Sequence, residues 1–197
     1  MDKYYFSLDL EMNQAENSPH TGKIIQVGVS FGNLSQDISE YETLSWYVNP
    51  NEKIHSRITE LTGITDQDVQ ENSTNIEDIY DKIVERISYY NCYVNPVVWG
   101  SGDVHLLKQS FLDQIGHCRI FGHRDIDVKT IYTFFQISKN KSTNSSLKSA
   151  LSSLKIRFDG EPHRAHNDAA NTLKLFSELI RRQNVMNKII EDASRLL

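Results

Sequence analysis

The first predicted strand, residues 4–12 (YYFSLDLEM), most constrains what this chain can fold into. Side chains alternate between the two faces of a strand, so Asp9 and Glu11 project from one side, about 7 Å apart. Two neighbouring carboxylates repel each other and are costly to bury unless a cation lies between them. The pair therefore predicts a metal site, although a half-buried strand with one face in water has the same pattern.

The composition indicates one ordinary globular domain. The chain has 197 residues, of which 39% are hydrophobic and 24% charged. No apolar run is long enough to span a membrane, and the N-terminus lacks the layout of a signal peptide. Cys92 and Cys118 form neither a metal-ligand spacing nor a disulfide framework, so we expect a reducing, cytoplasmic environment.

The formal net charge of −5 argues against binding nucleic acid through a broad basic surface. This objection weakens if the site itself is acidic. Bound divalent cations would then neutralise the carboxylates and hold a phosphate group instead.

The order of predicted elements indicates an α/β fold. Strands at 4–12, 23–31 and 41–48 follow one another closely and predict an antiparallel meander, with a hairpin turn at Gly32-Asn33. Helices then alternate with strands at 93–99 and 126–128, which gives a mixed five-stranded sheet flanked by helices. Gly63 is typical of a residue that ends a helix, and Thr65 of a residue that caps the next one. The other predicted helices cover residues 76–87, 103–115, 129–136 and 147–154.

The C-terminal part predicts a long helix capped by Asn167. Its apolar positions through Ile180 are predicted to be buried. We assign residues 1–183 to the main domain and residues 184–197 to an amphipathic helical extension of the same domain. The repeat through Ile189 and Ile190 predicts packing on the body, although a protein partner or a dimer contact would use the same pattern.

Two further carboxylates occupy positions from which they can join the first pair. Asp103 follows a predicted strand at the start of a helix, and Asp168 lies in the first turn of the long helix, five residues after His163. Each of them alone also fits a helix cap or a surface residue. Four converging carboxylates are the ligand set expected of two Mg²⁺ or Mn²⁺ ions, and a nearby histidine can take a proton from water.

This order of motifs resembles the DEDDh 3′→5′ exonucleases, whose fold is ribonuclease H-like. The likeness covers roughly residues 4–182, and within the family it is greatest to the histone-mRNA 3′ exonuclease group and its bacterial relatives of the sporulation-inhibitor type. The segments that carry it are Asp9-x-Glu11, Leu61-Thr62-Gly63-Ile64-Thr65-Asp66, Trp99-Gly100-Ser101-Gly102-Asp103, Ser146-Leu147-Lys148-Ser149-Ala150-Leu151 and Pro162 to Phe176 (PHRAHNDAANTLKLF).

The resemblance implies roles for individual residues. Asp9, Glu11, Asp103 and Asp168 would bind two Mg²⁺ or Mn²⁺ ions. His163 would be the general base, and His166, only two residues before Asp168, would be structural. The implied contacts to the terminal nucleotide are Leu10, Met12, Asn13, Leu61 and Thr62.

The predicted function is 3′→5′ exonucleolytic hydrolysis of single-stranded RNA or DNA, releasing nucleoside 5′-monophosphates. Two alternatives are a hydrolase of short oligonucleotides or small phosphodiesters, and a catalytically silent module that binds 3′ ends. A loop with Lys139 and Lys141, followed by Lys148, either steers a strand toward the site or is simply solvated.

Overall fold

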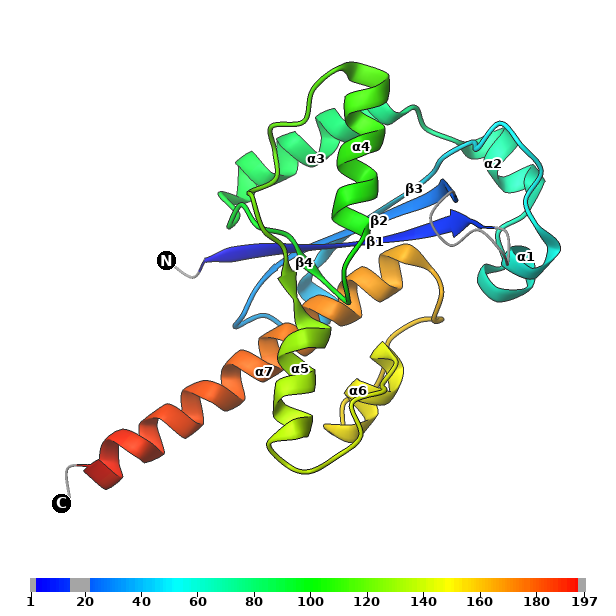
Figure 1. The fold of residues 1–197 in the computed structure, drawn as a ribbon. Coiled ribbons are helices and arrows are strands. Elements are labelled where there is room, and N and C mark those ends of the chain that lie inside the picture. Colours follow the sequence, from blue (N-terminus) through cyan, green and yellow to red (C-terminus); the bar gives the residue numbers. More distant parts are fainter. Residues whose placement is uncertain (1–2, 15–21, 195–197) are drawn as a thin grey trace.

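The computed structural model describes residues 3–14 and 22–194, and within them it shows an α/β fold built on one mixed sheet (Figure 1). The strand order is β3-β2-β1-β4-β5. Neighbouring strands among β1, β2 and β3 are antiparallel, whereas β4 pairs with β1, and β5 with β4, in parallel. The predicted fold class is confirmed. The strands are β1 (Tyr4–Asn13), β2 (Lys23–Asn33), β3 (Glu42–Tyr47), β4 (Val97–Val98) and β5 (Ile126–Asp127).

Helices cover both faces of the sheet. α3 and α4 lie on one face, and α7 crosses the other, with α5 and α6 beside it (Figure 1). Phe6, Leu8 and Leu10 of β1 enter the core beneath α3 and α4. The helices are the short 3-10 helix η1 (Ile38–Glu40), α1 (Ser56–Thr62), α2 (Asp66–Asn72), α3 (Ile76–Tyr90), α4 (Asp103–Ile115), α5 (Val128–Ile137), α6 (Leu147–Ser153) and α7 (Ala165–Ser194).

Three predicted element ends were wrong. Gly32 and Asn33 continue β2 instead of forming a turn, and the chain turns after Asn33, whose N–H donates to Gln36. The predicted strand at 93–99 shortens to Val97–Val98 because Pro96, with no N–H, cannot donate to a ladder. Val128 begins α5 instead of ending β5, since the Asp127 side chain caps that helix.

The face of β1 that carries the acids is not simply open to water. Ser7 is buried, and its hydroxyl donates to the carbonyl oxygen of Ala169 on α7, at 2.6 Å. Gly28 of β2 lies opposite Asp9, and a Cβ atom there would stand 2.1 Å from the backbone of Ala165. Glycine is therefore what lets the start of α7 touch the sheet next to the acidic pair.

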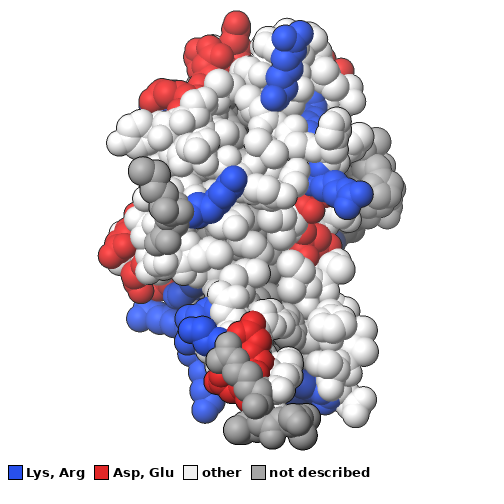
Figure 2. Space-filling view, turned by 90° about the vertical axis from the view of Figure 1, so that its left-hand side faces the viewer, with Lys and Arg blue, Asp and Glu red and all other residues white. Residues whose placement is uncertain are grey.

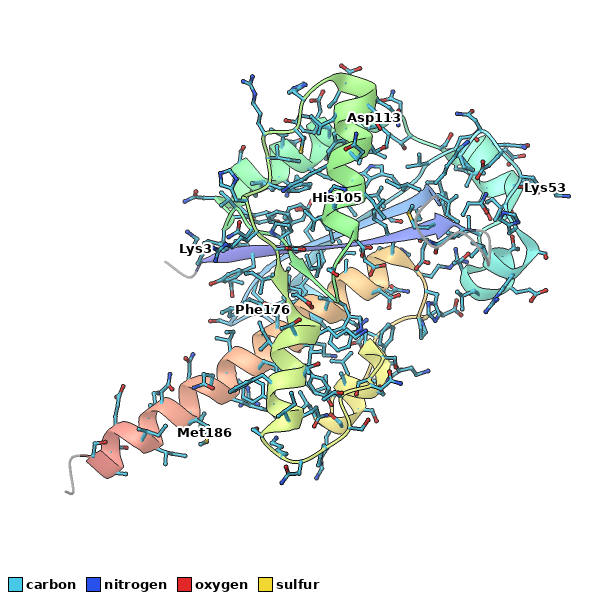
Figure 3. All side chains as sticks on the ribbon, viewed as in Figure 1. Lys3, Lys53, His105, Asp113, Phe176 and Met186 are labelled. Atoms are coloured by element: carbon cyan, nitrogen blue, oxygen red, sulfur yellow. The ribbon has the colours of Figure 1, made fainter. Side chains whose placement is uncertain are left out.

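The C-terminal helix differs from the prediction at both ends. It begins at Ala165, before Asn167, and the carbonyl oxygen of Arg164 accepts its first hydrogen bonds. It continues without a break across the predicted boundary at residue 183, and residues 181–194 are exposed on all sides, so the expected packing of this end on the body was wrong. The Arg182 guanidinium donates one hydrogen bond to the carbonyl oxygen of Leu154, just after α6, and Figure 1 shows the rest of this end projecting from the body. Figure 3 shows Phe176 among the side chains of the body and Met186 on the projecting part.

The surface carries no continuous basic area on the face shown in Figure 2, where Lys and Arg side chains form separate groups among acidic and uncharged residues. The charge argument from the sequence agrees with this view. Among the described residues, no helix is both long enough and apolar enough to cross a membrane.

Candidate active site

Four carboxylates from three separate elements meet at one place. Asp9 and Glu11 lie on β1, Asp103 is the first residue of α4, and Asp168 lies in the first turn of α7. Burial, and then the charges of Asp103, Asp168 and Glu11, raise the pKa of Asp9 well above its usual range. The structure thus brings together all four acids that the sequence singled out.

The same environment acts on the other three acids. Burial, followed by the charges of Asp168 and Asp103, raises the pKa of Glu11 to about 8. Burial raises the pKa values of Asp103 and Asp168 to about 6, in spite of a backbone hydrogen bond to each carboxylate, from Leu10 and His163 respectively. A buried cluster of one sign needs a compensating charge, and carboxylate oxygens are the ligands that Mg²⁺ and Mn²⁺ prefer. The residues present therefore fit divalent metal ions.

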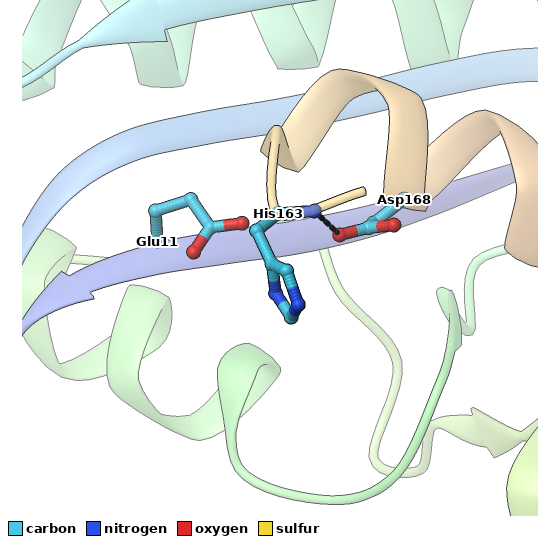
Figure 4. Close-up of side chains that lie close together, drawn as sticks. All are labelled: Glu11, His163 and Asp168. Atoms are coloured by element: carbon cyan, nitrogen blue, oxygen red, sulfur yellow. Dashed lines mark hydrogen bonds between the residues drawn. The ribbon is translucent and has the colours of Figure 1, made fainter. Parts of the chain in front are cut away.

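His163 stands at the edge of this cluster (Figure 4). A ring nitrogen of His163 and carboxylate oxygens of Glu11 and Asp168 all lie within 4.8 Å of one another. The backbone N–H of His163 donates to Asp168 Oδ2 at 2.9 Å, and its backbone adopts the left-handed region with φ 61°. The loop is thus tied to the acid on α7, while the imidazole stays exposed to solvent.

His166 occupies a different environment. It is the half-buried second residue of α7, and its Nδ1 has no hydrogen-bond partner among the described residues. Burial, and then the charge of Arg164, lower its pKa. The structure places His163, and not His166, beside Glu11 and Asp168.

The loop before α4 is fixed by a neighbouring helix cap. The Asp127 carboxylate accepts hydrogen bonds from the N–H groups of Lys129 and Thr130 at the start of α5, and from Gly100 N at 3.0 Å. This bond anchors the segment that leads into Asp103. The sequence marked this region by its glycines but did not reveal the role of Asp127.

The three predicted substrate contacts near the end of β1 differ in how accessible their side chains are. Leu10 is buried in the core, and Met12 lines a surface cleft of about 350 Å³ between β1, β2 and α4. Asn13 is buried, its amide donating to Glu52 and to the carbonyl oxygen of Lys53. The Asn13 side chain is therefore occupied in tying β1 to the segment before α1.

The two predicted contacts on α1 also differ. The side chain of Leu61 is 51% exposed, as a residue that meets a substrate base requires. Thr62 is buried, and its hydroxyl donates to the carbonyl oxygen of Ile58 and accepts from the N–H of Ile64. Of this pair, only Leu61 is accessible.

Sequence reasoning missed two residues that organise the site. Gln26 on β2 pairs with Glu11, is buried, and its side-chain oxygen accepts from Ala165 N, the first residue of α7, at 3.0 Å. Arg164 lies between this helix and α1. Gln26 stands between the apolar residues Ile25 and Val27, and an amide at such a position could have indicated a buried polar contact. Arg164 appeared in the sequence only as part of the motif around His163.

The strand order and the four converging acids agree with the ribonuclease H-like fold that the resemblance implied. Residues 6–176 match the RNase T exonuclease family, and the chain belongs to that family. The predicted family and the nuclease class are confirmed. DEDDh exonucleases use divalent metal ions, in agreement with the acidic cluster.

Curated relatives share the sequence at low identity. Small RNA degrading nuclease 3 of Arabidopsis thaliana is 27% identical over 174 residues, which are 86% of this chain and 19% of the relative. The 3′-5′ exonuclease DinG of Bacillus subtilis is 27% identical over 186 residues, 91% of this chain and 18% of the relative. The chain thus spans about a fifth of the length of these relatives.

One solved structure agrees over nearly its whole length. The nuclease domain of 3′hExo, a DEDDh family member bound to rAMP, superimposes with a TM-score of 0.76 at 20% identity, covering 92% of this chain and 93% of that one. The likeness establishes the shared fold.

Proposed function

We propose that this chain is a 3′→5′ exonuclease that hydrolyses single-stranded RNA or DNA with two bound Mg²⁺ or Mn²⁺ ions. The observation that carries the proposal is the convergence of Asp9, Glu11, Asp103 and Asp168 in one buried cluster, with His163 at its edge. The names of the two relatives, a small RNA degrading nuclease and a 3′-5′ exonuclease, support it.

Each residue has a defined role in the reaction. The four carboxylates would hold the cations, which would supply positive charge to the reacting phosphate and favour ionisation of water. His163 accepts the proton of the attacking water, whose oxygen forms a bond to phosphorus as the bond to the 3′ oxygen of the preceding nucleotide breaks. The 3′ oxygen takes up a proton from solvent, His163 returns its proton to solvent, and a nucleoside 5′-monophosphate is released. Leu61 contacts the terminal base.

The decisive experiment uses 5′-labelled single strands of RNA and of DNA, each with Mg²⁺, Mn²⁺ or a chelator. Wild type and His163→Ala are compared side by side, with His166→Ala as the matched control. A metal-dependent ladder that shortens from the 3′ end, lost in His163→Ala and retained in His166→Ala, is the expected result. Intact strands in every lane, with dinucleotides also uncut, would leave a binding module as the function.

A second candidate is hydrolysis of very short oligonucleotides. The observation that favours it is the lack of a continuous basic area on the face in Figure 2, since a long strand is usually held by such a groove. Rates measured on strands of increasing length separate the two. A rate that falls steeply beyond a few nucleotides would favour the oligonucleotide hydrolase.

We also propose that the projecting end of α7 pairs with a second copy of the chain. Val185, Met186, Ile189 and Ile190 are all at least half exposed and repeat at helical spacing on one side. An isolated helical segment of this length is marginal in water, so a covering surface would stabilise it. Light scattering on wild type, Ile189→Glu and the polar-face control Asn187→Glu tests this. Dimers lost only in Ile189→Glu are expected, and a monomeric wild type would refute the pairing.

A further inference from the structure

Arg164 lies at the junction of three parts of the site. It directly follows His163 and precedes α7, and its side chain reaches across the sheet toward β3 and the end of α1. Three residues in a row across the sheet connect the strands concerned: Glu11 of β1 is the strand partner of Gln26 on β2, and Gln26 is the strand partner of Tyr47 on β3. The Arg164 side chain thus links β3 to the end of α1.

Its contacts are few for a half-buried guanidinium. Nη1 donates one long hydrogen bond, 3.4 Å, to the hydroxyl of Tyr47. Nη2 lies against Gly63, only 2.9 Å from where a Cβ atom would stand. No carboxylate in the described parts of the chain forms an ion pair with Arg164. Burial raises the pKa of Glu11, and the Arg164 charge opposes that rise. Hydrogen bonds with Thr65 lower the pKa of Asp68, and the Arg164 charge adds to that lowering. The group therefore faces acids on two sides, one on β1 and one on α2.

Gly63 explains why the guanidinium fits closely. It ends α1 with φ 69°, a left-handed conformation that glycine adopts without strain, and its N–H donates to the carbonyl oxygen of Thr59. Without a Cβ atom, the backbone at the end of α1 can rest on the guanidinium. Leu61, two residues earlier, is an exposed apolar residue of this helix end, so its position relative to His163 depends on this contact.

We infer that Arg164 is a positioning residue that fixes the end of α1, and with it Leu61, relative to His163 and the acidic cluster. The inference rests on the proposed exonuclease function. Arg164 makes no contact with the reacting phosphate in this role. Its planar, permanently charged group is suited to hold two segments at a fixed spacing, which a lysine ammonium does less well.

The test compares two substrates that use the site differently. A dinucleotide needs its base placed by α1, whereas bis(p-nitrophenyl) phosphate offers a phosphodiester with no nucleoside. In Arg164→Met, kcat/KM for the dinucleotide falls about 10- to 100-fold, mainly through KM, while kcat/KM for the nucleoside-free ester is retained. Arg164→Lys restores part of the loss. Tyr47→Phe, which removes one contact, gives a smaller loss in the same direction, and exposed Arg124→Met gives none.

The outcomes are distinguishable. If wild type cleaves neither substrate, the proposed function fails. If wild type cleaves both and Arg164→Met loses both equally while its melting temperature is unchanged, Arg164 acts on the phosphate or the ions, and the positioning role is overturned. If Arg164→Met does not fold, Tyr47→Phe decides: an equal loss for the two substrates, or no loss, contradicts the inference.

Discussion

The two ends of α7 belong to one continuous helix, yet they lie in opposite environments. The first half crosses the sheet, buries Leu173, Leu175 and Phe176, and brings Asp168 to β1. The second half, residues 181–194, is exposed, and the Arg182 guanidinium donates one hydrogen bond to the carbonyl oxygen of Leu154. One helix therefore has a packed end that carries a candidate site residue and an exposed end. Contacts with the sheet and with neighbouring helices fix the position of the packed end.

The largest expected effect comes from the packed end. Asp168→Asn removes one charged oxygen from the proposed metal site and weakens the tie to His163, so we expect the rate of the proposed exonuclease to fall by on the order of 10³-fold. Asp192→Asn, the same change near the other end of the helix, leaves the rate unchanged. Single-strand cleavage at saturating Mg²⁺ measures both. Retention of activity in Asp168→Asn would remove α7 from the catalytic machinery.

The sequence predicted the packed end better than the free one, for a physical reason. The acids could be recognised because carboxylates at these positions have no inexpensive buried role without a cation. The start of α7 could not be predicted, because it is set by the distant contacts of Ala165 with Gln26 and with the backbone at Gly28. The pattern through Ile189 shows which side of a helix is apolar, but it does not show whether the same chain or another one covers that side.

A pair of truncations measures the contrast in stability. Phe176 is 5% exposed and Met186 is 50% exposed. Phe176→Ala leaves a cavity and should cost about 3–5 kcal/mol, whereas Met186→Ala in a dilute monomer should cost less than about 0.5 kcal/mol. Thermal melts at several protein concentrations give both values. If α7 pairs with a second copy, the effect of Met186→Ala grows with concentration, and an effect as large as that of Phe176→Ala in dilute solution would mean that this end is packed after all.

The last expected effect is the pH dependence of the metal-free protein, and it belongs to the acidic end alone. The folded pKa of Glu11, about 8, lies above its usual 4.5, so the folded state holds a proton that the unfolded state releases. Stability from this group is therefore complete below about pH 4.5 and is lost as the pH rises toward 8.

In chelator, the melting temperature should fall by a few degrees between pH 5 and 8, less in Glu11→Gln than in wild type. Added Mg²⁺ should reverse the loss at pH 8 in wild type, because ions bound by the ionised carboxylates stabilise the folded state. Equal slopes for wild type and Glu11→Gln would show that the pKa of Glu11 is not raised in the folded protein.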